Sequence, residues 1–242
     1  MLTFLLRRLA QTLPVLAGIA LLSFVFSEFS GDPIRSMLGQ TASPELKKQV
    51  REFYGYDKPR GERFLSYLSR LVRGDLGISI TKQGKSVSEL IADSMGVTFR
   101  LSLGAILFAV VFGVAAGILS AWKPFSILDY SASALAALGI SFPAFFLGML
   151  LLLFFAKGLG WFPIGGYEAG EVRYLALPCL TLGLISTASI SRLTRNCMLD
   201  TLAHDYIRSG RAKGLSERTI LLGHALPNAL VPIITIIGND FA

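Results

Sequence analysis

The side chains that could act as catalysts or metal ligands in this sequence are few and widely spaced. His204 and His224 lie twenty residues apart without a third ligand nearby, which argues against a zinc or nickel site. Cys179 and Cys197 give neither a disulfide framework nor a metal-binding spacing. No Gly-x4-Gly-Lys-Ser/Thr pattern for holding nucleotide phosphates is present, and Gly31-Asp32-Pro33 is typical of a turn rather than of a catalytic site. We therefore predict no catalytic residue, no metal site and no cofactor.

Two residues within apolar surroundings are candidates for a path through a membrane. Asp240 follows a run of apolar residues, and an acidic group inside a bilayer is a functional candidate because its charge is costly to bury. Pro143 lies between Gly139 and Gly148 in the longest apolar stretch, where it predicts a kink in the helix. The two glycines predict places on either side where the helix is narrow enough for close approach. The alternative is that these small residues serve helix packing alone.

The apolar stretches around these residues predict membrane-spanning helices. The chain is 52% apolar and 16% charged, with a mean hydropathy of +0.58, whereas soluble domains average about 25% charged residues. Crossing a bilayer takes about 20 apolar residues in a helix. Four charge-free stretches meet this need: Leu9–Ser27, Leu101–Trp122, Tyr130–Ala156 and Tyr174–Ser191. A fifth apolar stretch begins near Ala225. Gly104, Gly113 and Gly117 predict close packing of the second helix. The expected fold is an all-α membrane protein, a polytopic helical bundle.

The charges between the spans predict the orientation of the chain. Arg7 and Arg8 precede the first span and predict a cytoplasmic N-terminus. Residues 192–218 carry six basic and three acidic residues, whereas residues 157–173 carry two of each, so the first loop is expected inside and the second outside. The net charge of +7 is explained by these loops without nucleic-acid binding. We expect a cytoplasmic end and first span in residues 1–28, an extracytoplasmic cap in 29–95, and the helical core in 96–242.

The outer cap is predicted to contain two amphipathic helices. The first opens at Pro44, and Phe53, Tyr54 and Tyr56 follow as aromatic anchors. The second has an apolar stripe at spacings of three and four residues, formed by Phe64, Leu65, Leu68, Leu71 and Val72. Gly74 is expected to end it. These helices would lie on the membrane surface or pack on the ends of the spans, and the sequence leaves both open.

Residues 192–227 predict two helices joined at a glycine on the inner side. The first helix has an apolar face formed by Leu199, Leu202, Ala203, Tyr206 and Gly210. Gly214 is expected to end it in a left-handed conformation, and Ser216 to cap the second. This second helix, Glu217–Leu226, runs into Pro227 and the fifth span. Such a segment suits docking into another protein, and the alternative is a solvated loop.

The same segment carries a recognisable motif. Tyr206–Arg218 followed by His224–Ala229 resembles the EAA loop of bacterial ABC-importer permeases. The framework of that loop is a glycine, nine residues, an apolar position, one further residue and Leu-Pro. Gly214, Leu226 and Pro227 fall on this framework.

The departures from the motif are informative too. Arg208-Ser209-Gly210 replaces Glu-Ala-Ala, and His224 holds the apolar position, as in the dipeptide, oligopeptide and nickel branch. Further short motifs along the chain resemble that branch: Arg7-Arg8, Gly31-Asp32-Pro33, Tyr54–Pro59, Gly74–Ser79, Gly139–Pro143 and Leu177-Pro178.

The resemblance implies a six-helix permease subunit in the inner membrane of a bacterium. Its partners would be a second, homologous permease, two cytoplasmic ATPase subunits and an extracytoplasmic solute-binding protein, with the lipid bilayer around it. Five of the six helices are present, so we expect a C-terminally truncated chain. The two helices joined at Gly214 and the resemblance together predict contact with the ATPase. The residues expected to make or transmit this contact are Arg208, Arg211, Gly214, Leu215, Arg218, Leu226 and Pro227.

The substrate stays open between two classes. Di- or oligopeptides are favoured over nickel or a nickel chelate because the spans contain no succession of histidine or cysteine side chains that could bind nickel along the path. An ion-coupled secondary transporter would need acids at the midplane, and the first four spans contain none. A membrane enzyme would need clustered catalytic groups, and an inert scaffold would not need the basic hairpin. The expected chain is a transport subunit that leaves ATP hydrolysis to its partner.

Overall fold

The computed structural model describes residues 2–29, 34, 38, 43–53, 55–79, 82, 85–168 and 170–241. The Gly31-Asp32-Pro33 turn and Tyr54 lie outside these residues. The chain forms two compact units, Met1–Met95 and Gly96–Ala242.

The described part of the first unit contains a long apolar helix, two short amphipathic helices and the start of a helix that continues into the second unit. The first three are α1 (Leu2–Phe29), α3 (Pro44–Phe53) and α4 (Arg60–Val72). Helix α4 packs against the end of α1, where the rings of Phe24 and Phe64 lie 5.3 Å apart and Arg63 pairs with Glu28 at 2.5 Å. Gly74 follows α4 with a φ of +77°, which confirms the predicted helix end. Of the two arrangements predicted for this helix, packing on a span end is the one observed.

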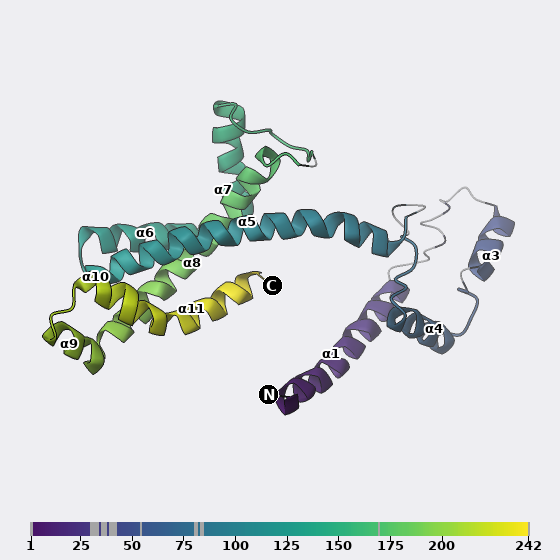
Figure 1. The fold of residues 1–242 in the computed structure, drawn as a ribbon. Coiled ribbons are helices and arrows are strands. Elements are labelled where there is room, and N and C mark those ends of the chain that lie inside the picture. The colour runs from purple at the N-terminus through teal and green to yellow at the C-terminus, as the bar shows by residue number, and fades with distance from the viewer. Residues whose placement is uncertain are drawn as a thin grey trace. The chain divides into compact units, whose positions relative to one another are not determined.

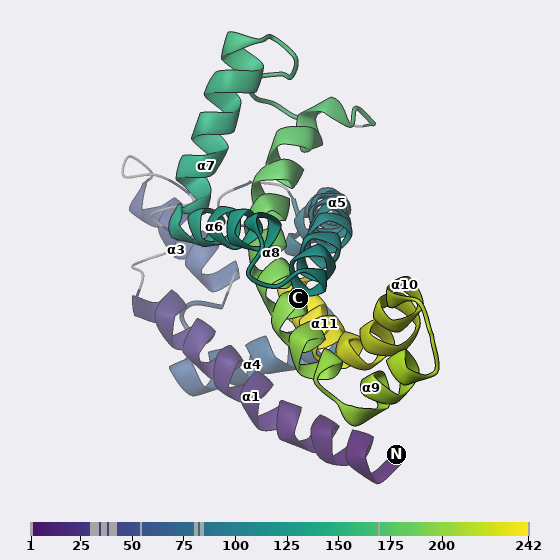
Figure 2. The ribbon, with the colours of Figure 1, turned by 90° about the vertical axis from the view of Figure 1, so that its left-hand side faces the viewer.

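Helix α5 begins in the first unit and continues into the second, which holds the other described helices. Their bounds are α5 (Val87–Trp122), α6 (Ile127–Ser141), α7 (Ala144–Leu151), the π-helical turn η1 (Leu152–Gly158), α8 (Arg173–Leu202), α9 (Asp205–Ala212), α10 (Glu217–Thr219), the π-helical turn η2 (Ile220–Ala225) and α11 (Leu226–Phe241). Figures 1 and 2 show α8 and α11 side by side, with α9 and α10 together at one end of them. We call residues 205–226 the hairpin.

The long helices pack through small residues and two apolar clusters. A side chain at Gly113 or Gly117 of α5 would strike α8, because a Cβ atom there would lie 3.0 Å from Ile190 and 2.5 Å from Thr194. The close packing predicted from these two glycines is confirmed. One cluster joins α5, α8 and α11, and the other joins these helices to the hairpin.

Among the residues that the structure describes, four helices are long and apolar enough to cross a membrane, and α6 with α7 and η1 gives a fifth if the bent pair is one span. The predicted all-α polytopic fold is confirmed. The kink predicted at Pro143 is confirmed, but the chain bends there by 105° between Ser141 and Ala144, so Tyr130–Ala156 is not covered by one continuous helix. Phe142 is extended (φ −85°, ψ 130°) before Pro143, which caps α7. Proline disfavours helical geometry in the preceding residue and lacks a backbone donor, so α6 ends here.

The helix boundaries between residues 174 and 214 also differ from the prediction. Helix α8 continues past Ser191 to Leu202, because the charge-free stretch marks only the apolar part of a longer helix. A helix running unbroken from Leu199 to Gly214 is not formed, since His204 is extended (φ −72°, ψ 151°) and α9 starts afresh at Asp205.

Candidate functional site: the inner hairpin and its anchors

The hairpin is fixed to the helical bundle by buried aliphatic side chains. Ile207 of α9 is 1% exposed and lies in one cluster with Ile220 and Leu221 of η2. Met198 of α8, Ala121 of α5 and Ile233 of α11 belong to the same cluster. Full burial of an isoleucine is worth about 1.5–3 kcal/mol. The hairpin is therefore part of the core and not a solvated loop.

The turn of the hairpin is a glycine C-cap. Gly214 has a φ of +80°, the left-handed region that favours glycine. Its N–H donates to the Arg211 carbonyl, and the Leu215 N–H donates to the Gly210 carbonyl, which is the Schellman pattern. Ser216 then accepts from the N–H of Thr219 and caps the next helix. The predicted glycine turn and serine cap are confirmed.

An ion pair closes this turn from outside. The Arg211 guanidinium donates to both carboxylate oxygens of Glu217, at 2.8 and 3.1 Å. The hydrogen bonds to this carboxylate raise the pKa of Arg211. Both side chains are nearly half exposed, so the pair holds the turn without being part of the core.

The exposed face of the hairpin carries cations together with apolar side chains, among them Leu215 and Leu222. Arg208 keeps 76% of its side chain exposed beside Asp205, 3.6 Å away, and Arg218 is exposed as well. Leu215 is 39% exposed. The structure thus separates a buried apolar face from an exposed basic face.

The hairpin continues into α11 without a loop. The turn η2 leads directly to Leu226, which packs on the buried cluster, and to Pro227, which is exposed. Asn228 braces the junction by donating to the His224 carbonyl at 2.7 Å and to the Tyr206 hydroxyl at 3.1 Å. The hairpin and α11 are therefore joined by continuous helical backbone.

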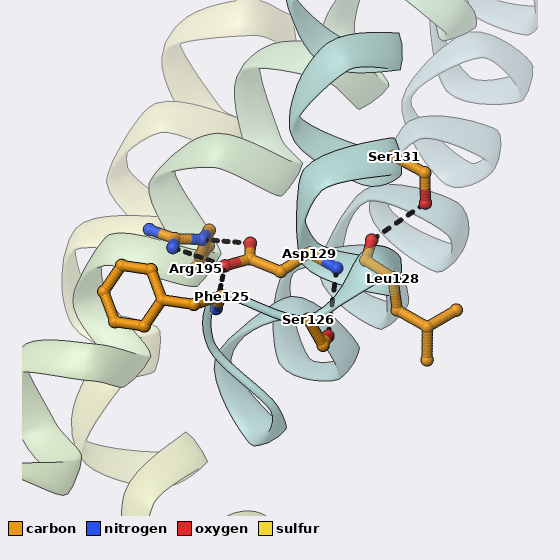
Figure 3. A network of polar contacts seen from close by, with 6 residues as sticks. All are labelled: Phe125, Ser126, Leu128, Asp129, Ser131 and Arg195. Atoms are coloured by element: carbon orange, nitrogen blue, oxygen red, sulfur yellow. Dashed lines mark hydrogen bonds and ion pairs between the residues drawn. The ribbon is translucent and has the colours of Figure 1, made fainter.

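An ion pair with a buried carboxylate joins α6 to α8. Arg195 of α8 donates to both oxygens of Asp129 at 2.5 and 2.7 Å (Figure 3), and Asp129 is 2% exposed. The same carboxylate accepts from the N–H of Phe125 at 2.9 Å, in the turn between α5 and α6. Phe125 has a φ of +60°, which is strained for a non-glycine residue. One acid thus holds a strained turn and a neighbouring helix.

The two predicted path residues lie apart from the hairpin. Pro143 is exposed at the break between α6 and α7, and Asp240 is exposed at the far end of α11. Cys179 and Cys197 form no disulfide with each other. Within the described residues, no group of three or more His, Cys, Asp or Glu side chains is placed to hold a metal ion.

The sequence reasoning missed Ile207 and the Asp129–Arg195 pair. It placed Tyr206 on the apolar face, but Tyr206 is 44% exposed and its neighbour is buried instead. For Asp129 a signal was available, since Ser126 and Asp129 have the spacing of a capping box before an apolar run. Ser126 does cap α6, accepting from the Asp129 N–H.

Comparison with known proteins gives matches along nearly the whole chain. Residues 113–242 match the family described as binding-protein-dependent transport system inner membrane component. Residues 1–103 match the N-terminal family of such membrane components. These two families meet near the boundary between the two compact units.

Three relatives are similar over at least 98% of this chain. The oligopeptide transport system permease protein AppB of Bacillus subtilis is 37% identical, and the alignment covers 78% of its length. The glutathione transport system permease protein GsiC of Escherichia coli K12 is 38% identical over 78% of its length. The di/tripeptide transport system permease protein DppB of Pseudomonas aeruginosa is 35% identical over 79%.

Proposed function

This chain belongs to the family of binding-protein-dependent transport system inner membrane components, and from that premise we propose that it translocates peptides across the membrane as a permease subunit. The resemblance predicted from the hairpin motif is confirmed by the family match, as is the prediction of a multi-pass transport subunit rather than an enzyme. Family membership implies an ATPase and a substrate-binding protein as partners.

The proposed substrates are di- or oligopeptides. The relatives are named for oligopeptides, for glutathione, which is itself a tripeptide, and for di- and tripeptides. None of these three names refers to nickel, and no metal-binding cluster is found in the described part of the chain. These observations support peptides over the nickel alternative.

The proposed ATPase-docking surface is the exposed face of the hairpin, with Arg208, Arg211, Gly214, Leu215 and Arg218, while Leu226 and Pro227 form the proposed coupling junction to α11. The observation that carries this proposal is the anchoring of Ile207, Ile220 and Leu221 in the core, together with the unbroken helix from η2 into α11. A surface that is rigid on one side and exposed on the other transmits force, whereas a flexible loop absorbs it.

The rest of the assembly follows the family resemblance. The proposed complex has a second, homologous permease, two ATPase subunits and one solute-binding protein. In this arrangement the N-terminus and residues 192–227 face the cytoplasm, residues 29–95 form the outer cap, and residues 96–242 form the permease core. Pro143 and Asp240 are proposed to line the path of the substrate.

Uptake by the assembled complex tests the function. Proteoliposomes that hold the complex and enclose ATP should accumulate a radiolabelled tripeptide only when the binding protein is present outside. Nickel uptake without peptide uptake would overturn the peptide proposal. For docking, cross-linkers at positions 211, 215 and 218 should capture the ATPase, and a cross-linker at Tyr167 in the outer loop should not. Capture from Tyr167 alone would contradict the assigned surface.

A further inference from the structure

We propose that Asp129 and Arg195 are positioning residues that make the broken span α6–α7 follow the movement of the hairpin. This inference rests on the proposed function, since the movement is that of a permease driven by an ATPase. Its carboxylate is buried, its two hydrogen bonds are bidentate, and it joins α6 to α8, the helix whose Met198 belongs to the buried cluster of the hairpin.

The carboxylate of Asp129 fixes the turn between α5 and α6. It accepts the N–H of Phe125 at 2.9 Å, while the Asp129 N–H donates to Ser126 Oγ at 3.3 Å (Figure 3). Turn and helix start are thereby joined to one side chain. Because Arg195 binds both oxygens of that side chain, the whole turn is tied to α8.

On the α8 side, the pair lies next to the anchor of the hairpin. Arg195 stands three residues before Met198, so the two side chains project from neighbouring positions of the helix surface. Met198 is fully buried against the cluster that holds Ile207 and Ile220. A displacement of the hairpin core therefore displaces the segment of α8 that carries Arg195.

On the other side, α8 supports both halves of the broken span. A Cβ atom at Gly139 of α6 would lie 3.1 Å from the Ala188 methyl, and one at Gly148 of α7 would lie 3.4 Å from Thr181. Residues later in α6 and α7 contact residues earlier in α8, so α6 and α7 run antiparallel to α8. The break at Pro143 thus lies between two contacts with the same helix, and the ion pair holds the inner end.

The chemistry of the pair suits positioning better than stability. Replacing a buried ion pair by apolar side chains is often neutral or stabilising, so stability alone does not call for charges here. Two parallel hydrogen bonds from a planar guanidinium fix one register and one orientation. If α6 slid along α8, both bonds would break and leave Asp129 buried without its partner. The pair therefore permits joint movement and resists sliding.

The test uses the full complex in proteoliposomes with single and exchanged variants. Asp129→Asn and Arg195→Gln should lower peptide uptake about tenfold while the binding-protein-stimulated ATPase rate stays near wild type, so more ATP is spent for each peptide. The exchange Asp129→Arg/Arg195→Asp should recover part of the uptake lost in the single variants. Asp93→Asn, which breaks the exposed pair with Lys85, is the matched control and should change neither rate.

A second measurement needs no substrate, so it separates failure of this inference from failure of the proposed function. Spin labels at Ser131 of α6 and Asn196 of α8, both exposed, report the distance between these helices after Cys179 and Cys197 are replaced by alanine. We expect a narrow distribution in the otherwise native chain and a broad one in Asp129→Asn. Unchanged distances would overturn the inference, as would parallel loss of ATPase and uptake. Absence of peptide uptake by the wild type would instead count against the proposed function.

Discussion

Gly117 lies where α5 and α8 come closest, and its replacement by alanine tests the packing directly. The added Cβ atom would lie 2.5 Å from Thr194 Cβ and 2.7 Å from the Ser191 carbonyl oxygen. Favourable contacts between carbon atoms lie at about 3.5–4.0 Å. Since one obstacle is backbone, a change of rotamer cannot relieve the clash, and the helices have to separate by about 1 Å.

The magnitude follows from this overpacking. Inserting a methyl group into a packed contact costs about 1–3 kcal/mol. Separation also loosens the cluster at the hairpin, because Val114 and Ile118 of the same helix pack against it. For a chain of this size each kcal/mol lowers the melting temperature by about 2–4 °C, so Gly117→Ala should melt about 2–12 °C below the wild type.

The assay is thermal unfolding of the purified chain in detergent, followed by the fluorescence of Trp122 and Trp161. The matched control is Gly96→Ala in the same helix, where an added Cβ atom meets nothing within 4 Å. Alanine is a better helix former than glycine by about 1 kcal/mol, so the control should melt at or slightly above the wild type. Equal melting temperatures for the two variants would refute the contact between α5 and α8.

Three further changes probe the hairpin. Ile207→Ala should cost about 2–5 kcal/mol in unfolding, well above Tyr206→Ala, because only Ile207 is fully buried; similar costs would contradict the assigned faces. Gly214→Val should cost about 1–2 kcal/mol for its left-handed backbone and impair uptake with insertion into the membrane intact; normal uptake would count against the glycine turn. Glu217→Gln should change the free energy of unfolding by about 1 kcal/mol or less, because its ion pair with Arg211 is exposed and is screened by salt. A large loss of stability in this variant, measured at high salt, would contradict this.

The fold was largely predictable because a bilayer imposes strong constraints on sequence. A lipid-exposed segment must be apolar over about 20 residues and must satisfy its backbone internally, so charge-free stretches translate directly into helices. The turn at Gly214 was predictable for a similar local reason, since a left-handed residue between two helices favours glycine. The bend at Pro143 was predictable as a kink, but not as 105°, because that angle depends on what α6 and α7 pack against.

The apolar face of α9 shows where local reasoning stops. Helical periodicity assigns faces only while the helix is unbroken, and the extended residue His204 resets the phase. After that reset, Ile207 points to the core and Tyr206 to the outside. Nothing in the spacing of apolar residues reveals the break, because neither proline nor glycine occurs between Leu199 and Ser209.

The Asp129–Arg195 pair was beyond sequence reasoning for a different reason. The inner segments contain several basic residues, and each of them contributes equally to the orientation signal. Only the packing of α6 on α8 selects Arg195 as the partner, by bringing together residues that lie sixty-six positions apart. Burial makes this choice of partner important, because the carboxylate of Asp129 is shielded from water and needs the guanidinium of Arg195 to balance its charge. The guanidinium of Arg208, by contrast, is solvated. Tertiary structure therefore divides the cations of residues 192–218 between two environments: Arg195 is paired with a buried carboxylate of a neighbouring helix, and Arg208 is exposed on the hairpin.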